Sequence, residues 1–522
     1  MASKLTSITY AANAASGSAR QILPSYLLHA LTSSSNSIVG GPPSLLSLIN
    51  GQWVGAESGR TVAVRSPADG TILAHVPNMT KSDTDSAINA ASMAFPKWSA
   101  LSPFERSAAV RRMYDLLMRS ADEVGVLLSL ESGKPQLEAV GEVKYAADFF
   151  EWYAEEGKRS YGHVLPPQRA DRRLITMQQH IGVTACLTPW NFPAAMPARK
   201  LAPALVAGCT VVLRPSIDTP LSALALARMS QEAGIPAGVV NVVLGEDHVE
   251  TAGVLCSSSL VKKLSFTGST QVGKQLAAAC APTLKRLSLE LGGRAPFIVF
   301  DDADLDAAAE GAVQSKYRNA GQTCVCANTF LIQSGIADVF VSKLVSRISA
   351  LKVGDGLVSG SQVGPLISEK AIVNMEALVS DAVSKGAVVV SGGTRIAANV
   401  NGGKGFFFAP TVLDHCRPGM RCVDEEVFGP IAPIVRFKDD NEAIKIANAS
   451  SVGLAAYFFT TSNQRTWKVQ EALQVGMVGV NTGLISTATA PFGGIKDSGY
   501  GREGAQQGLG EYLQWKYVMQ AI

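Results

Sequence analysis

The chain has 522 residues, and its 46 basic and 43 acidic side chains leave a formal net charge of +3. That near balance excludes the clustered positive charge by which proteins bind nucleic acid or anionic membranes. Hydrophobic residues make up 47% of the chain, which excludes a disordered chain, a collagen-like repeat and a small disulfide scaffold. The charged fraction of only 17% favours a protein that buries surface between subunits.

The first 44 residues form an extension ahead of the folded part of the chain. No Asp or Glu occurs before Glu57, serine is frequent, and the full cations of the segment are Lys4 and Arg20. Such a composition is similar to that of an organellar transit segment, and an untargeted extension is the alternative. The expected localisation is therefore mitochondrial or cytoplasmic.

Ordered sequence is expected to begin near Leu45. The segment LLSLINGQWV predicts two strands around a turn at Asn50-Gly51. Apolar residues at helical spacing then predict helices over residues 82–98, 105–134 and 143–156.

The pattern then changes to short apolar strands separated by helical segments. These strands are predicted at residues 181–187, 210–213, 239–243 and 264–266. Such alternation indicates βαβ units on a parallel sheet, and its return from 295 to about 483 indicates a second α/β domain.

Neither the apolar segments nor the cysteines indicate a membrane or metal protein. The most apolar stretch, residues 201–213, lies between Lys200 and Arg214 and is shorter than the ~20 residues that span a bilayer. We interpret it as a buried helix that runs into a buried strand. The eight cysteines contain no CxxC pair and no Cys/His cluster with zinc-ligand spacing, so no metal site is expected.

Two glycine patterns are candidate nucleotide sites. Gly499 to Gly504 matches GxGxxG, but too little chain follows it for a βαβ unit, so we interpret the match as accidental. The second pattern includes Gly268, Gly273 and Gln275 and lies between a strand and a helix. Gln275 replaces the hydroxyl that a P-loop uses for Mg²⁺, which argues against ATP hydrolysis. The helix N-terminus still suits an anion, although an ordinary strand-to-helix turn would explain the glycines equally well.

Cys324 and Glu290 are the candidate catalytic residues. Cys324 follows a glycine at 321, beside backbone that is free to direct an N–H at a substrate oxygen, and Glu290 precedes Gly-Gly. Taken singly, a buried structural cysteine and a surface-turn glutamate explain these residues as well.

Six segments together resemble the aldehyde dehydrogenase superfamily, in order and in spacing, over roughly residues 45 to 522. They are TPWNFP (188–193), FTGSTQVG (266–273), LELGGRAPF (289–297), NAGQTC (319–324), EEVFGP (425–430) and PFGGIKDSG (491–499).

The resemblance implies a Rossmann-like cofactor domain, an α/β catalytic domain and a small β oligomerisation element. The cofactor domain would comprise residues 45–157 and 181–292, and the catalytic domain residues 293–492. The oligomerisation element would comprise residues 158–180 and 493–522. The oligomerisation element would combine a hairpin between Tyr161 and His180 with a strand from Glu511 to Tyr517. Members of the family are homodimers or homotetramers.

The catalytic roles follow from the same resemblance. Cys324 is similar to the nucleophile that forms a thiohemiacetal, and Asn191 to the donor that stabilises the oxyanion. Glu290 is similar to the base that activates water to hydrolyse the thioester, and its presence argues against transfer to coenzyme A. A non-catalytic, lens-type structural protein is the remote alternative.

The implied cofactor is NAD or NADP, and no metal is implied. The matching positions are Trp190, Arg214, Ser216, Gly268, Ser269, Gly273, Glu426 and Phe428. NAD-preferring members often have Glu where this chain has Ile217, and members usually have Lys at 214. Ile217 neither accepts ribose hydrogen bonds nor repels a 2′-phosphate, and Arg214 could pair with one, so the preference leans slightly to NADP.

The substrate is an aldehyde, and the likeness is greatest to succinate-semialdehyde dehydrogenases. Arg199, Arg318 and Ser486 resemble their ligands for the substrate carboxylate. One alternative is that these arginines pair with acidic residues at a subunit contact. Another is that the chain is a related enzyme that acts on an aldehyde of specialised metabolism, because Pro197 and Tyr317 depart from the pattern of those relatives.

Cys326 is a redox candidate. In some of these relatives the equivalent cysteine closes a reversible disulfide with the nucleophile. Cys324 and Cys326 would face the same side of an extended stretch. A Cys326 that only fills a gap in the core is the alternative.

Overall fold

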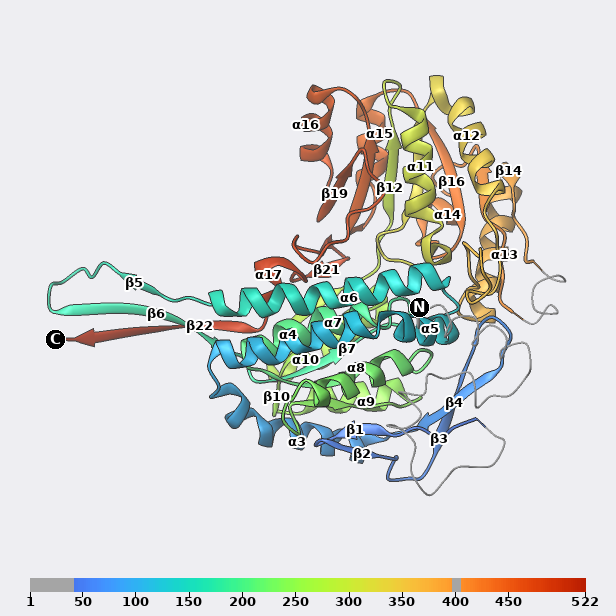
Figure 1. The fold of residues 1–522 in the computed structure, drawn as a ribbon. Coiled ribbons are helices and arrows are strands. Elements are labelled where there is room, and N and C mark those ends of the chain that lie inside the picture. The colour runs from blue at the N-terminus through green and yellow to red at the C-terminus, as the bar shows by residue number, and fades with distance from the viewer. Residues whose placement is uncertain (1–41, 397–404) are drawn as a thin grey trace.

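Two open β-sheets flanked by helices form the frame of the protein in a computed structural model that describes residues 42–396 and 405–522 (Figure 1). The predicted α/β class is confirmed. The N-terminal extension predicted for residues 1–44 lies outside the described residues except for its last three, of which Ser44 forms a bridge with His75.

The first ordered elements are two antiparallel strand pairs. The predicted strands around Asn50-Gly51 are β1 (Ser47–Ile49) and β2 (Gln52–Val54). Asn50 and Gly51 have φ of 52° and 74°, as a tight two-residue hairpin turn requires. A second pair, β3 (Thr61–Arg65) and β4 (Ile72–Pro77), lies outside the predicted elements.

Four helices follow, in the region where the sequence predicts helices. They are α3 (Lys81–Ser99), α4 (Pro103–Arg119), α5 (Ala121–Ser132) and α6 (Gln136–Glu156), with the short η2 (Gly157–Arg159) after them. Capping boxes begin α3 at Thr80 with Asp83 and α4 at Ser102 with Glu105, because each pair satisfies N–H groups that have no partner within the helix. Helix α6 packs against α4, α5 and the later helix α7 (Ala195–Ala207).

The first sheet contains the predicted βαβ units. Its strand order is β21-β11-β10-β7-β8-β9, and all neighbours are parallel except β21 with β11. The strands are β7 (Val183–Leu187), β8 (Thr210–Arg214), β9 (Val240–Val242), β10 (Val261–Thr267), β11 (Arg286–Glu290) and β21 (Gly499–Tyr500). The helices are α7 (Ala195–Ala207), α8 (Leu221–Glu232), α9 (His248–Ser257), α10 (Thr270–Cys280) and η3 (Ala281–Thr283). The apolar stretch 201–213 is a helix followed by a strand, as predicted.

The second sheet has seven strands in the order β14-β15-β16-β13-β12-β18-β19, parallel except for the β14–β15 pair. They are β12 (Ala295–Val299), β13 (Ala327–Gln333), β14 (Val388–Ser391), β15 (Thr411–Asp414), β16 (Ile431–Phe437), β18 (Ala455–Phe459) and β19 (Met477–Val480). The helices are α11 (Leu305–Lys316), η4 (Arg318–Gly321), η5 (Ser334–Ile336), α12 (Ala337–Ser349), α13 (Glu369–Ser384), α14 (Arg421–Asp424), α15 (Asp440–Asn448) and α16 (Asn463–Ala472). The short strands β17 (Val452–Gly453) and β20 (Ile495–Lys496) pair beside this sheet.

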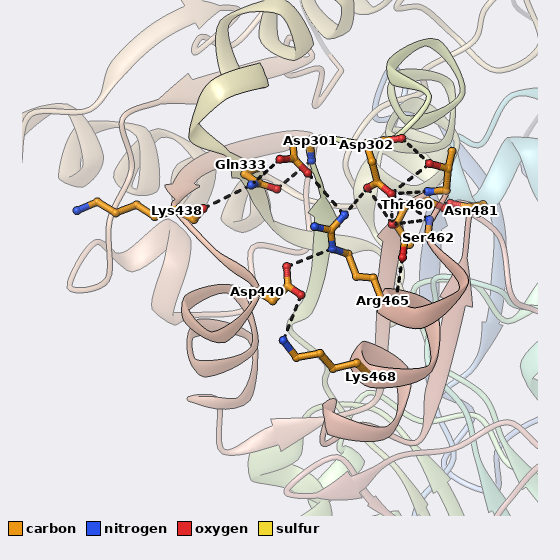
Figure 2. A network of polar contacts seen from close by, with 11 residues as sticks. Asp301, Asp302, Gln333, Lys438, Asp440, Thr460, Ser462, Arg465, Lys468 and Asn481 are labelled. Atoms are coloured by element: carbon orange, nitrogen blue, oxygen red, sulfur yellow. Dashed lines mark hydrogen bonds and ion pairs between the residues drawn. The ribbon is translucent and has the colours of Figure 1, made fainter.

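A polar network joins helices α15 and α16 to the end of strand β12 (Figure 2). The guanidinium of Arg465 donates to Asp302 at 2.6 Å and to Asp440 at 3.2 Å, and it lies 4.7 Å from the ring centre of Phe300. Asp302 also accepts from the N–H of Ser462, next to the start of α16. Because Arg465 is satisfied by two carboxylates, it ties the outer helices to the core of the second sheet.

The remaining strands form a separate three-stranded ribbon, β22-β6-β5, which projects from the body at the left of Figure 1. Strands β5 (His163–Leu165) and β6 (Arg172–His180) make the predicted hairpin. The predicted C-terminal strand is β22 (Leu513–Ala521), which pairs antiparallel with the full length of β6. Before it, α17 (Ala505–Gly510) packs against α6 and α7.

Candidate active site

A cavity of about 620 Å³ lies where the carboxyl ends of strands from the first sheet approach the second sheet. Ligands of open α/β sheets bind at such strand ends. Among the residues lining the cavity are these predicted site residues: Trp190, Asn191, Arg214, Ser216, Gly268, Ser269, Glu290, Cys324, Glu426 and Phe428. Gly273, Arg199, Arg318, Ser486 and Cys326 are not among its lining residues.

Cys324 lies in a turn between η4 and β13. Just before it, Asn319, Ala320 and Gly321 all have left-handed backbone, with φ of 51°, 53° and 77°. Consecutive left-handed residues are strained when they carry a Cβ, and such strain is concentrated at functional sites. Burial raises the pKa of the Cys324 thiol well above its ordinary value, and the neighbouring Glu290 carboxylate raises it further.

The extended stretch expected at 324–326 is wrong. Cys324 and Val325 lie in a turn, closed by the N–H of Cys326 donating to the carbonyl of Thr323 at 3.0 Å. The Cys326 thiol lies 3.5 Å from the carbonyl of Lys316, whereas Cys324 interacts with Glu290. The extended backbone therefore no longer supports a disulfide between Cys324 and Cys326. The disulfide stays a prediction that rests on the family resemblance.

Glu290 is the last residue of β11 and is buried rather than exposed on a surface turn. Neither carboxylate oxygen has a hydrogen-bond partner among the described residues. Burial, and then the nearby Glu503 carboxylate, raises the pKa of Glu290 to about 8. An unpartnered carboxylate of this pKa beside a thiol is suited to accept a proton near neutral pH.

The two glycines after Glu290 are required by close packing. A Cβ on Gly292 would lie 2.6 Å from a carboxylate oxygen of Glu426, and one on Gly293 would lie 2.5 Å from the main-chain oxygen of Cys324. The N–H of Gly293 donates to Glu426 at 3.0 Å. The LELGG segment thus holds both the cysteine and the second carboxylate of the cavity.

Asn191 lies in the loop between β7 and α7 and is 5% exposed. Its side-chain N–H₂ donates to the main-chain oxygen of Gln322 at 3.1 Å, which fixes the orientation of the amide. One amide hydrogen remains for another acceptor, and the buried amide oxygen has no partner within residues 42–396 and 405–522. Loop β7–α7 therefore presents a free donor next to the segment that carries Cys324.

The lining of the cavity suits a dinucleotide. Ser269 caps α10 by accepting from the N–H of Val272 at 3.4 Å, so the predicted strand-to-helix turn is confirmed and the helix N-terminus borders the cavity. Ala252, Val272 and Leu276 give this end an apolar wall. The Glu426 carboxylate, whose pKa burial raises to about 7, and the Trp190–Phe428 ring pair border the other end. A cavity of about this volume, with both apolar and polar lining residues, is typical of a ligand site.

Two of the predicted cofactor residues have more local roles than expected. Arg214 uses Nε to bond Thr251 and one Nη to bond the carbonyl of Gly245, both at 3.2 Å, so its guanidinium is partly engaged. Gly273 lies within α10, where a Cβ would meet the side chain of Leu291 at 2.4 Å. Its role is close packing of α10 against the segment after Glu290.

The two predicted arginines have different surroundings, and neither lines the cavity that contains Cys324. Arg199 is 2% exposed; it donates to the Tyr145 hydroxyl at 2.5 Å and pairs with Glu503 at 3.5 Å. It also interacts electrostatically with Cys324. Arg318 borders a second cavity, of about 310 Å³, and lies 5.6 Å from the ring centre of Phe192.

The Nε atoms of both arginines are buried and lack a hydrogen-bond partner in the described part of the chain. Ser486 is partly buried in the loop that includes Leu484, which borders the same second cavity as Arg318. Arg199 pairs with an acidic residue of its own chain rather than at a subunit contact, and Arg318 interacts electrostatically with Glu138, which lines the same second cavity.

Sequence reasoning missed two groups of residues. His248 and Lys370 line the cavity, from the starts of α9 and α13. Behind Glu290, Lys200 pairs with Glu503 at 2.5 Å. The available signal for the second group was Lys200, directly before the apolar stretch 201–213, because a buried ammonium requires a partner.

Two negative findings concern the described residues alone. None of their helices is long and apolar enough to cross a membrane. They contain no group of three or more His, Cys, Asp or Glu side chains arranged to hold a metal ion.

Comparisons with known proteins agree with this geometry. The model of the aldehyde dehydrogenase family matches residues 53–518. Glutarate-semialdehyde dehydrogenase of Pseudomonas putida is 52% identical over 90% of this chain and 96% of its own length. The NADP⁺-dependent succinate-semialdehyde dehydrogenase GabD of Escherichia coli is 52% identical over 90% and 97%, and mitochondrial succinate-semialdehyde dehydrogenase of Arabidopsis thaliana is 51% identical over 90% and 88%.

Solved structures match the fold as well. The crystal structure of an NADP-dependent enzyme of E. coli matches with a TM-score of 0.89 at 52% identity, over 91% of this chain and 98% of that chain. The family match spans nearly all of the described residues and includes every segment around the cavity. The chain belongs to the aldehyde dehydrogenase family and is an NAD(P)-dependent oxidoreductase.

Proposed function

We propose that this protein oxidises short aldehydes that carry an anionic group at the far end, and succinic semialdehyde first of all. The proposal is carried by the buried Nε atoms of Arg199 and Arg318, neither of which has a hydrogen-bond partner among the described residues. Buried guanidinium donors without partners are costly, and a carboxylate satisfies them with charge-assisted bonds. The names of the relatives give further support, because succinate and glutarate semialdehydes both have a terminal carboxylate.

In this mechanism the Cys324 thiol loses its proton to the neighbouring Glu290 carboxylate as the sulfur attacks the aldehyde carbon. The free amide hydrogen of Asn191 stabilises the negative charge that develops on the aldehyde oxygen. The nicotinamide, when bound, supplies an acceptor for the hydride that the thiohemiacetal loses. Glu290, deprotonated again, activates water to hydrolyse the thioester at Cys324 and release the acid. The net reaction consumes aldehyde, NAD(P)⁺ and water, and gives acid, NAD(P)H and a proton.

The preferred cofactor in this proposal is NADP⁺, with NAD⁺ also used. Arg214 and Ser216 border the cavity near His248, and Ile217 offers no carboxylate to repel a 2′-phosphate. We expect kcat/KM with NADP⁺ to be at least equal to that with NAD⁺, and Ile217→Glu to favour NAD⁺. A wild-type preference for NAD⁺ above about tenfold, equivalent to ~1.4 kcal/mol, would contradict this part.

We assign the domains and the oligomerisation element in the same proposal. The first sheet and its helices (45–157 and 181–292) form the cofactor domain, the second sheet (293–492) the catalytic domain, and the ribbon (158–180 and 493–522) the oligomerisation element of a homodimer or homotetramer. β21, from the last segment, pairs with β11 and so belongs structurally to the first sheet. The acid-free N-terminal sequence and a relative named as mitochondrial support a mitochondrial or cytoplasmic location.

A substrate panel tests the proposal. We expect kcat/KM for succinic semialdehyde to exceed that for butyraldehyde, which lacks the carboxylate, by at least 100-fold, corresponding to ~2.7 kcal/mol. Arg318→Ala should reduce that ratio by a similar factor, whereas Arg228→Ala, at a partly exposed pair with Glu232 in α8, should leave it unchanged. Equal values for the two aldehydes, or an unaltered ratio in Arg318→Ala, would overturn the carboxylate site.

Glutarate semialdehyde is the second candidate. It is favoured by the P. putida relative, whose identity of 52% equals that of E. coli GabD. The two substrates differ by one methylene, so the same panel ranks them: a higher kcat/KM for the longer aldehyde would reassign the preferred substrate and leave the anionic class in place.

A further inference from the structure

A buried lysine, Lys134, contacts the loop that carries the proposed oxyanion donor. It lies between α5 and α6 and is 2% exposed. Its Nζ donates to the main-chain oxygen of Asn191 at 3.1 Å and lies 3.9 Å from the ring centre of Phe192, the next residue. The side chain thus holds two consecutive residues of the β7–α7 loop.

The same ammonium forms an ion pair with Glu142 of α6, and both side chains are 1% exposed. Glu142 accepts with its other oxygen from the N–H groups of Ala194 and Ala195, at 2.9 and 3.2 Å. These N–H groups belong to the start of α7 and would otherwise have no partner. Lys134 and Glu142 together fix the loop at its Asn191 end and at its helix end.

Asn319 completes the arrangement from the side of the nucleophile. Its side-chain N–H₂ donates to the main-chain oxygens of Asn191 and Gln322, at 3.0 and 3.1 Å. Gln322 is also the acceptor that orients the Asn191 amide. The main-chain oxygen of Asn191 therefore receives two donors, and any movement of it would move the amide relative to Cys324.

A charge at this position is not explained by stability alone. Burying an ion pair costs desolvation free energy, and neutral residues of similar volume often stabilise a protein equally well. An ammonium does, however, fix a carbonyl more strongly than a neutral donor does. We propose that the buried Lys134–Glu142 pair is a positioning unit that holds Asn191 at the oxyanion site. The proposal rests on the role assigned to Asn191 in the proposed function.

The decisive experiment is a double-mutant cycle between the pair and Asn191. Lys134→Met/Glu142→Gln removes the ammonium and the negative charge together, and the glutamine retains an oxygen for Ala194 and Ala195. We expect kcat to fall roughly tenfold or more, within the ~10²–10³-fold range for loss of an oxyanion donor, with KM for NADP⁺ unchanged. In an Asn191→Ala background the same change should cost less than about twofold, because Lys134 acts through Asn191.

Two controls separate this role from a structural one. Lys158→Met/Glu155→Gln changes a partly exposed lysine–glutamate pair and should leave kcat unaltered. All rates are measured with succinic semialdehyde and with propionaldehyde, so that an error in the substrate assignment does not affect the cycle. If the double variant does not fold, Lys134→Gln supplies the same cycle with a neutral donor.

The outcomes are distinct. Equal fold-losses in the wild-type and Asn191→Ala backgrounds, or a kcat loss that merely follows a lower Tm, would overturn the positioning role. If Asn191→Ala itself leaves kcat unchanged, the assignment of the oxyanion donor fails instead. A loss confined to the wild-type background supports the proposal.

Discussion

The Glu290 carboxylate carries the pH dependence of the proposed reaction. Its pKa is raised to about 8 by burial, so the protonated form predominates at pH 7 and the base form increases as the pH rises. We therefore expect kcat for succinic semialdehyde to rise with pH and to level off above about 8. The measurement is a pH profile of kcat at saturating cofactor.

Glu290→Gln provides the control for that profile. We expect it to lower kcat by roughly 10²–10⁴-fold, as for loss of a general base, and to leave the residual rate independent of pH between 6 and about 9. A profile with an inflection near 4 to 5, or the same inflection in the variant, would show that another group titrates.

Among individual residues, the sequence motifs identified those that react but not those that hold them in position. Cys324, Glu290 and Asn191 belong to segments with recognisable order, and all three line one cavity. The Lys134–Glu142 pair, by contrast, matters because it contacts the β7–α7 loop, which lies more than fifty positions further along the chain. No local pattern encodes such contacts, because lysine and glutamate side chains normally face solvent.

The helices and strands were largely predictable because their apolar periodicity is strong. The α7–β8 segment is an example: residues 195–213 are all buried, and Gly208 ends the helix with left-handed backbone at φ 91°. The turn at 324–326 was not predictable from alternation. Its conformation is set by the left-handed residues before it and by the packing of Gly293 against Cys324.

The close packing of Gly293, in the connection between β11 and β12, against Cys324 can be tested by substitution. Gly293→Ala would place a Cβ 2.5 Å from the main-chain oxygen of Cys324, so the nucleophile segment must move. We expect a loss of about 1–3 kcal/mol in the free energy of unfolding and a fall in kcat of at least about tenfold. Urea unfolding and steady-state rates measure the two effects.

Gly253→Ala is the matched control. Gly253 lies in α9, next to the cavity residue Ala252, and a Cβ there would have no neighbour within 4 Å. Alanine favours a helix over glycine by up to ~1 kcal/mol, so this variant should be as stable as the wild type or more so, and fully active. Wild-type kcat in Gly293→Ala would refute the packing argument.

At the scale of the whole molecule, the projecting ribbon is the feature that a single chain does not explain (Figure 1). Trp515, Tyr517 and Met519 alternate along β22 and are 54–57% exposed. An apolar row of this kind on a projecting sheet is typical of a subunit contact. We expect light scattering after gel filtration to give a dimer or tetramer for the wild type.

Charge on that row should break the assembly. Trp515→Glu/Tyr517→Glu is expected to give a monomer, because it would bury two unpaired carboxylates at the contact. Gln514→Glu, at the neighbouring position on the opposite face of β22, should retain the wild-type mass. A monomeric wild type, or an unaltered mass in the double variant, would contradict the proposed role of the ribbon.

The central claim is that the acyl group is carried by Cys324 and released by Glu290. The most direct measurement is intact and peptide mass spectrometry of Glu290→Gln after mixing with succinic semialdehyde and NADP⁺, together with the absorbance of NADPH. The account predicts that NADPH and a succinyl group on the peptide that contains Cys324 appear together and slowly, up to about one of each per active site, because the thiol loses its proton more slowly without Glu290 and the thioester is not hydrolysed. An acyl group on another residue, or steady turnover at the wild-type rate with Cys324 unmodified, would contradict it.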